Sequence, residues 1–218
     1  MRPTVERQVV LPWAQVLRIS FNALRARLFR SLITTATLVL AVAFVAYTFA
    51  GYALLNALWP HAPSELQEKI VSSGYELFAG TFGSTAKDRW LIALSLLVCA
   101  VGIVNAQLMA VTERFREIGT LKCLGALDSF VIKLFVLEAV YQGLLGGAAG
   151  SALGVLVSSA TLLVKFGTAV MRHFPALELA WIAAWSTGLA MLLSLTGVLY
   201  PAWVAARMEP ALALRTEQ

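Results

Sequence analysis

Four long apolar stretches dominate the pattern of hydrophobic and polar positions along this chain. They cover residues 32–58, 90–111, 134–164 and 180–200. A helix needs roughly 20 apolar residues to cross the ~30 Å hydrocarbon core of a bilayer, and every stretch reaches that length. Strands that cross membranes are two to three times shorter, so a barrel is excluded. The pattern predicts an all-α integral membrane protein with four transmembrane helices, the fourth ending at Pro201.

A different pattern precedes the first span. Over residues 12–30 apolar side chains recur at helical spacing, with Arg18, Asn22 and Arg25 on the opposite face. The apolar positions are Trp13, Val16, Leu17, Phe21, Leu24 and Leu28. Such an amphipathic helix lies in the membrane interface with its arginines facing lipid phosphates, and we expect it to fix the depth of the first span.

The loop between the first two spans, residues 56–89, is the longest connection on its side of the membrane. Ser64 can cap a short helix there, and Gly74 can end it. The loop is too small to form a folded domain with its own core. We therefore expect a short loop on the outside face and no substrate-binding ectodomain.

The basic residues predict the orientation of the spans. Twelve of them lie before the first span, between the second and third, or after the fourth, and five lie in the other two loops. The five are Lys69, Lys87, Arg89, Lys165 and Arg172. Cytoplasmic loops carry the excess of Lys and Arg, so both termini are predicted to be cytoplasmic.

Composition narrows the class of protein. Hydrophobic residues make up 59% of the chain and charged residues 13%, whereas soluble domains carry about 25% charged residues. A soluble enzyme and a disordered chain are therefore excluded. The formal net charge is +5, but the basic residues flank apolar stretches instead of forming one patch. This distribution favours contact with membrane lipids and excludes nucleic acid as a partner.

The sequence offers no site for chemistry of its own. The dipeptide Gly-Lys never occurs, so no P-loop for ATP is present. The only histidines, His61 and His173, lie in loops without a carboxylate or cysteine at ligand spacing, and Cys99 and Cys123 form no metal motif. We therefore predict no catalytic residue, no metal and no directly bound cofactor.

Among the polar residues inside predicted spans, Asn105, Glu138 and Gln142 are the candidates for a functional role. An ionisable group within the membrane suggests contact with a proton or substrate. A single carboxylate makes no relay, however, so Glu138 is expected instead to turn toward the cytoplasm or bond to a neighbouring helix end. Asn105, and Gln107 beside it, are interpreted as interhelical hydrogen-bonding groups.

The third span contains a ladder of glycines that lets two helix backbones approach closely in lipid. The pattern predicts tight packing, either within the chain or across a dimer. The residues are Gly143, Gly146, Gly147, Gly150 and Gly154.

Residues 112–130, after the second span, alternate charges of both signs with an apolar residue every third position. The apolar residues are Phe115, Ile118, Leu121 and Leu124. A short helix with this pattern either presents an apolar ridge to a partner protein or packs its ridge beneath the membrane, and the pattern alone supports both equally.

Three blocks in this order resemble the FtsX-like permease family, the transmembrane subunits of MacB- and LolC-type ABC systems. The first comprises Asn105 and then Glu113–Ala126, similar to the motif E-R-x-R-E-I-G-x-L-[RK]-x-L-G-A. The second is Phe135–Ala139 followed by the glycine ladder. The third is the tail Tyr200–Arg215, similar to Y-P-A-x-x-A-A-R-x-x-P-x-x-A-L-R.

The resemblance implies that residues 1–218 form one permease domain in the bacterial inner membrane. It implies a dimer with a second copy or a related permease, and ABC ATPase subunits that bind ATP and magnesium on the cytoplasmic side. Residues 112–130 would then be the coupling segment that docks on the ATPase. The docking residues would be Glu113, Arg114, Phe115, Arg116, Glu117, Ile118, Gly119, Leu121, Lys122, Leu124 and Gly125.

One departure from the family concerns the outside face. Well-known relatives carry a large ectodomain between the first two spans, where this chain has only residues 56–89. A periplasmic adaptor or an ectodomain-bearing subunit would supply that part, or the substrate would come from the membrane itself. The resulting hypothesis is a permease that extrudes a lipid-like, lipoprotein or hydrophobic substrate or drives a periplasmic partner. The alternative is a four-span scaffold or regulatory anchor without transport.

Overall fold

The computed structural model describes residues 13–78, 80–114, 118–120, 123 and 128–207, with side chains described from Leu32 onward except those of Phe78 and Phe130. The chain forms two compact units, residues 1–33 and residues 34–218. The first is described as helical from Trp13. All packing described below lies within the second unit.

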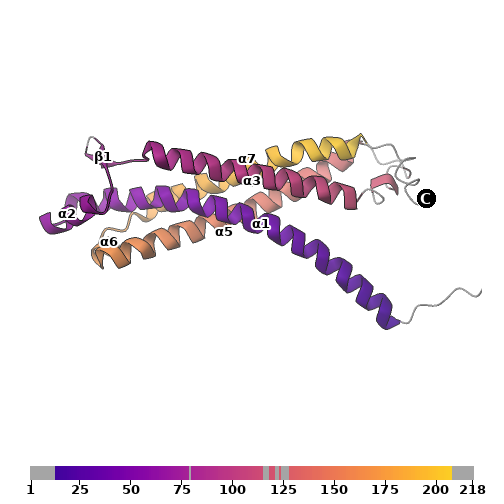
Figure 1. The fold of residues 1–218 in the computed structure, drawn as a ribbon, viewed down its shortest axis with the longest axis horizontal. Coiled ribbons are helices and arrows are strands. Elements are labelled where there is room, and N and C mark those ends of the chain that lie inside the picture. Colours follow the sequence, from indigo (N-terminus) through magenta and orange to yellow (C-terminus); the bar gives the residue numbers. More distant parts are fainter. Residues whose placement is uncertain (1–12, 79, 115–117, 121–122, 124–127, 208–218) are drawn as a thin grey trace, which may run out of the picture. The chain divides into compact units, whose positions relative to one another are not determined.

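Four helices are long and apolar enough to cross a membrane, which confirms the predicted four-span architecture. They are α1 (Trp13–Leu58), α3 (Ala86–Glu113), α5 (Asp128–Phe166) and α7 (Ala176–Ala206) (Figure 1). In α1 the candidate span covers Leu32–His61, and the helix runs without a break from the region predicted to be amphipathic. The placement of that region in the membrane interface stays a prediction.

The prediction that Pro201 ends the fourth span helix was wrong, because α7 continues through it to Ala206. Proline removes one backbone hydrogen bond, yet membrane helices tolerate it where neighbouring helices cover the site. Pro201 is fully buried here and lies beside the buried Ala202. The packing around α7 therefore overrides the local stop signal.

The glycine ladder of α5 lies against other helices of the same chain. A Cβ atom on Gly150 would lie 2.7 Å from the carbonyl oxygen of Val39 on α1, and Gly146 and Gly154 face the same helix. Gly143 and Gly147 face α7, where a Cβ on Gly147 would lie 2.8 Å from that of Ala190. These contacts bring the backbone of α5 close to α1 on one side and to α7 on the other.

The connection between α1 and α3 folds back onto the ends of the spans. It contains the short helices η1 (Trp59–His61) and α2 (Ser64–Ser72) and the antiparallel strands β1 (Leu77–Phe78) and β2 (Thr81–Phe82). The strands are joined at Gly80, which has φ +88°, and α2 is followed by Gly74, with φ +85°. The N-cap of α2 is Pro63, so the prediction that Ser64 caps this helix was wrong.

This connection has no core of its own but completes that of the bundle. Ile70 of α2 and Phe82 of β2 are buried against Leu54 of α1 and Leu162 of α5. We call this end, with residues 59–85 and the short helix α6 (Ala169–Arg172), the hairpin end. We call the other, where α3 stops at Glu113 and α7 at Ala206, the Glu138 end.

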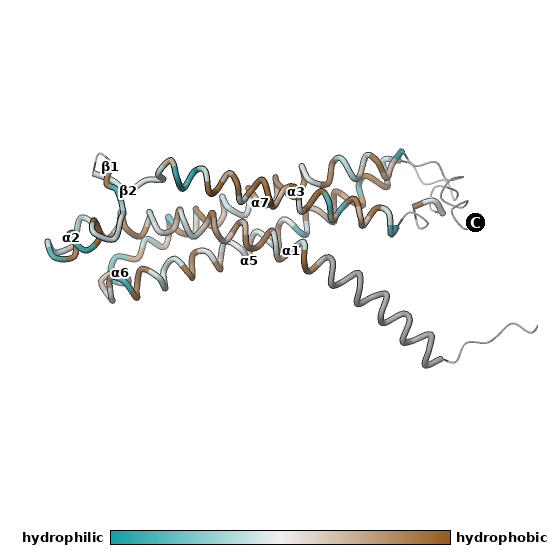
Figure 2. Tube along the Cα trace, viewed as in Figure 1, coloured by the Kyte–Doolittle hydropathy of each residue, from teal (hydrophilic) through white to brown (hydrophobic). Residues whose placement is uncertain are grey.

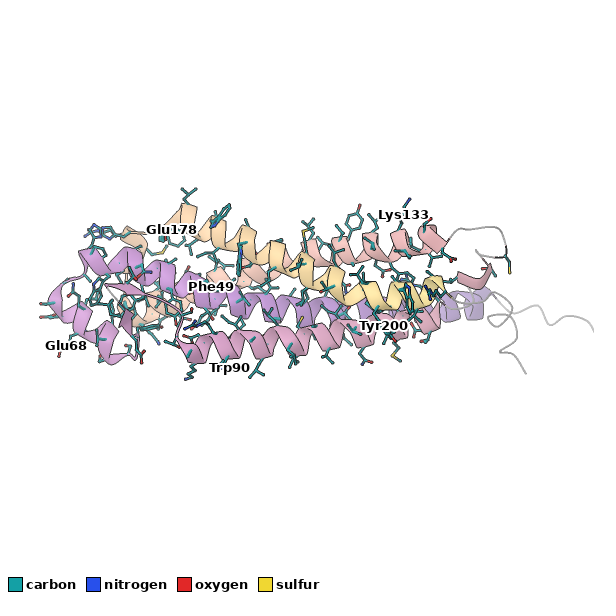
Figure 3. All side chains as sticks on the ribbon, turned by 90° about the horizontal axis from the view of Figure 1, so that it is seen from above. Phe49, Glu68, Trp90, Lys133, Glu178 and Tyr200 are labelled. Carbon is teal, nitrogen blue, oxygen red and sulfur yellow. The ribbon has the colours of Figure 1, made fainter. Side chains whose placement is uncertain are left out.

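Hydropathy changes along the bundle as expected for a membrane protein. Brown, hydrophobic segments run along the middle of the long helices, and hydrophilic segments gather toward their ends (Figure 2). Glu68 and Glu178 lie at the hairpin end and Lys133 at the opposite one (Figure 3).

Candidate functional site

An ion pair joins two helices at the Glu138 end. Arg114, the C-cap of α3, donates from Nη1 to Oε2 of Glu138 on α5 at 2.8 Å and from Nη2 to Oε1 at 3.3 Å. The two side chains are 32% and 38% exposed, so water screens part of their attraction. Of the alternatives for Glu138, the bond to a neighbouring helix end is the one that the structure contains.

One turn further into the bundle, Gln142 links three helices. Its Nε2 donates to Oγ1 of Thr34 on α1 at 2.6 Å, and its Oε1 accepts from Nε2 of Gln107 on α3 at 3.2 Å. Gln107 is buried. Its bond to Gln142 is an interhelical hydrogen bond of the kind that the sequence predicted. Satisfying these amides inside the bundle removes the cost of placing them in hydrocarbon.

Asn105 differs from its neighbour Gln107. It is exposed on α3, and within the part of the chain that the structure describes its side chain makes no hydrogen bond. The interhelical bond predicted for Asn105 is therefore not made within this chain as described.

The segment after α3 contributes a side chain to the core of the bundle. Ile118 is 4% exposed and packs in a cluster with Val111 of α3, Phe135 of α5 and Val198 of α7. Because this side chain is enclosed by its own chain, it is not available to a partner in this arrangement. For Ile118 the structure corresponds to the alternative in which the ridge packs beneath the membrane.

The other predicted docking residues fall into two groups. Glu113 is exposed at the end of α3, and Gly119 is buried beside Ile118. Seven lie outside the described residues: Phe115, Arg116, Glu117, Leu121, Lys122, Leu124 and Gly125.

At the hairpin end the structure brings together two residues that the sequence analysis treated separately. The rings of His61 and His173 are stacked, with centroids 4.1 Å apart and planes 16° apart. Each histidine closely follows the end of a predicted outward-running span, which is the signal that could have paired them. Over the described ranges, however, no three His, Cys, Asp or Glu side chains gather to hold a metal ion.

Taken together, these features define a multi-pass helical membrane protein whose polar side chains link helices to one another. The profile of the FtsX-like permease C-terminal family matches residues 90–210, which is more than half of the chain. The protein therefore belongs to the FtsX-like permease family.

The chain is also similar to ABC permeases over stretches longer than that match. The chain is 34% identical over 164 residues to a macrolide export ATP-binding/permease protein MacB of Syntrophobacter fumaroxidans, covering 74% of this chain and 22% of that protein. It is 39% identical over 130 residues to a pyoverdine export ATP-binding/permease protein PvdT of Pseudomonas syringae, covering 58% and 18%. An uncharacterised ABC transporter permease of Methanocaldococcus jannaschii is 37% identical over 132 residues, 57% of this chain and 31% of that protein. The chain thus spans about a fifth to a third of these relatives.

Proposed function

We propose that this chain is the membrane-spanning permease subunit of an ABC transporter and that it contains no ATPase of its own. ATPase subunits holding ATP and magnesium would bind the segment Glu113–Gly125, and their closure would move the spans. The family membership and the names of the export permeases that it resembles support this proposal.

The observation that carries the proposal is the double attachment of this segment to the bundle. Arg114 ties its start to Glu138 of α5, and four residues later Ile118 is buried against α3, α5 and α7. A displacement of the segment would therefore reach three spans through one ion pair and one apolar contact. A freely hanging loop would transmit no such displacement.

The same proposal covers the partners, the membrane and the task of the chain. The chain would pair with a second copy or a related permease in a bacterial inner membrane, with both termini cytoplasmic. Its task would be extrusion of a lipid-like, lipoprotein or hydrophobic substrate, or driving of a periplasmic partner such as an adaptor or ectodomain-bearing subunit.

The first test is association with an ATPase. The tagged chain is purified from its native membranes in mild detergent, co-purifying proteins are identified and ATP hydrolysis is assayed. Glu117→Lys with Leu121→Asp is expected to abolish association while membrane insertion is kept. Glu68→Lys with Val71→Asp makes the same changes at exposed positions of the hairpin end and should leave association intact. If no ATP-hydrolysing protein co-purified with the wild-type chain, the result would favour the scaffold alternative.

The second test separates binding from coupling. Glu138→Arg lies outside the docking segment and is expected to keep the ATPase bound but to lose the stimulation of hydrolysis by transported substrate, because it then repels Arg114. Combining it with Arg114→Glu restores an opposite-charge pair and should restore stimulation. If the double variant showed no more stimulation than the single variants, the ion pair would not take part in coupling.

A further inference from the structure

A cavity of about 200 Å³ lies at the hairpin end between α1, α3 and α5. It is partly open, and its wall includes Tyr75 from the connection between the first two spans. None of the residues assigned above to ATPase docking or to the helix-linking polar bonds contributes to it. The cavity is therefore a feature that the proposed function leaves unused.

One part of the cavity wall, which we call the groove, lies along α1 and is mostly apolar. Phe44, Tyr47 and Gly51 follow one another along a single face of α1, and Leu162 of α5 lines the same space. From Phe44 to Tyr52 the helix rises about 12 Å. That depth is close to the ~15 Å of one leaflet, half of the hydrocarbon core. The groove thus has a lining that suits part of an alkyl chain.

The outer part of the cavity carries adjacent charges of opposite sign. Asp88 is held in place through Oδ2, which accepts hydrogen bonds from the Tyr52 hydroxyl at 2.5 Å and from Oγ1 of Thr85 at 2.6 Å. Among the described residues no group donates to its other oxygen, Oδ1. Lys87 is exposed beside it, and both residues line the cavity.

Aromatic rings complete this outer part. Tyr52 and Tyr75 line it together with the two charges, and the ammonium of Lys165 lies 5.6 Å from the centre of the Tyr75 ring. Tyrosine rings beside a carboxylate suit an ammonium group, while a lysine suits a phosphate. The charge pattern therefore matches a headgroup that bears both signs.

We propose that this cavity binds a zwitterionic phosphate-and-amine lipid from the leaflet at the hairpin end. One acyl chain lies along α1 from Gly51 to Phe44. The phosphate contacts Lys87, and the ammonium contacts Asp88 and the tyrosine rings. The proposal does not depend on the proposed function, because lipid binding of this kind needs no ATPase.

The test uses photolabelling in vesicles of phosphatidylglycerol that contain a trace of phosphatidylethanolamine with a diazirine on one acyl chain. After irradiation and digestion, mass spectrometry maps the adducts. We expect adducts on the peptide that includes Phe44–Tyr52, roughly tenfold more than with the same diazirine chain on a phosphatidylglycerol headgroup. Labelling confined to exposed helix faces, or equal labelling by the two headgroups, would overturn the proposal.

A cavity-filling variant and a matched control complete the test. A Cβ on Gly51 meets only Oγ of Ser158 at 3.4 Å, so Gly51→Leu places its side chain in the groove without a backbone clash. It should lower the α1 adducts roughly tenfold. Gly188→Leu makes the same change on α7, where a Cβ meets nothing within 4 Å, and should label as the wild type does. Undiminished α1 labelling in Gly51→Leu would also overturn the proposal.

A second variant leaves the helix packing untouched. Lys87→Gln removes the charge that contacts the phosphate at an exposed position. Adducts of the phosphatidylethanolamine label on the peptide that includes Phe44–Tyr52 should fall, with circular dichroism as in the wild type. Undiminished labelling of that peptide in a folded Lys87→Gln variant would contradict the headgroup assignment.

Discussion

The two ends of the bundle are held together by different kinds of interaction. At the hairpin end, Phe82 and Ile70 close a buried apolar cluster, and Asn56 hydrogen-bonds both backbone groups of Phe82, at 2.6 Å and 3.0 Å. At the Glu138 end, a smaller apolar cluster is joined to an ion pair about one third exposed. Buried apolar contacts and hydrogen bonds, including that from Tyr52 to Asp88, bind one end, and a solvent-screened charge pair helps bind the other.

This difference predicts which end can rearrange at low cost. Breaking a buried apolar contact costs several kcal/mol, whereas an exposed ion pair is worth about 0–1 kcal/mol. The end proposed to contact the ATPase is thus the one whose polar link opens easily. The hairpin end is expected to keep its structure while the Glu138 end moves.

The largest expected effect comes from truncating the aromatic that closes the hairpin end. Phe82 packs edge-on against Trp59, with ring centroids 5.2 Å apart. Phe82→Ala should lower the free energy of unfolding by about 3–5 kcal/mol because it leaves a cavity in a buried cluster. Hydrogen exchange should rise over residues 64–82 and stay unchanged near Glu138.

Phe135→Ala is the matched change at the other end, where Phe135 is 1% exposed. It should lower the free energy of unfolding by about as much as Phe82→Ala does. Hydrogen exchange should rise over residues 128–139 instead. If either substitution increased exchange at both ends equally, the two ends would not be independent and the comparison would fail.

A smaller effect is expected from the side chain that fixes β2. Asn56→Ala leaves the N–H and the carbonyl of Phe82 without their partner, which should cost about 1–3 kcal/mol. Thermal unfolding in detergent measures the loss. Asn105→Ala truncates an exposed asparagine and should stay within about 0.5 kcal/mol of the wild type. Equal losses in the two variants would contradict the role of Asn56.

The helix cap at the start of α3 should contribute less again. Thr85 and Asp88 form a capping box, in which each side chain accepts a hydrogen bond from the other's backbone N–H. Thr85→Ala should lower the free energy of unfolding by about 1 kcal/mol. Thr196→Ala removes an exposed hydroxyl bonded only within its own helix and serves as the control in the same unfolding measurement. A Thr85→Ala variant as stable as this control would argue against the cap.

The smallest expected effect on stability is that of the ion pair. Arg114→Gln should cost no more than about 1 kcal/mol, because both side chains are partly solvated. Raising the salt concentration should destabilise the wild type slightly and the variant less. A loss as large as that of Phe82→Ala would show that the pair behaves as a buried one and would reverse the comparison.

The spans could be predicted from the sequence because each depends on local properties, namely length, hydropathy and flanking charge. The contacts that organise the two ends could not. Phe82 shares a buried cluster with Leu162, eighty residues away in the chain, and the cavity that Leu162 lines needs three helices to exist. Pattern alone left both alternatives open for the segment after α3. The burial of Ile118 depends on Phe135 and Val198, which no local signal relates to it.

Signals of helix termination also failed where packing prevailed. Pro201 is a strong local stop, yet the surrounding helices keep it in α7. The glycine ladder, by contrast, correctly predicted that another helix packs closely on α5. Which helices do so, α1 and α7, is known only from the structure.

The proline within α7 has a mechanical consequence. Because Pro201 has no N–H, the carbonyl of Gly197 lacks its usual partner in the helix. A Cβ on Gly197 would lie 2.7 Å from Cγ2 of Ile103, so α7 packs closely on α3 at the residue whose carbonyl lacks its partner. We therefore expect the last turn of α7 to bend at this point more easily than the rest of the helix, and to carry with it the buried contact with Ile118.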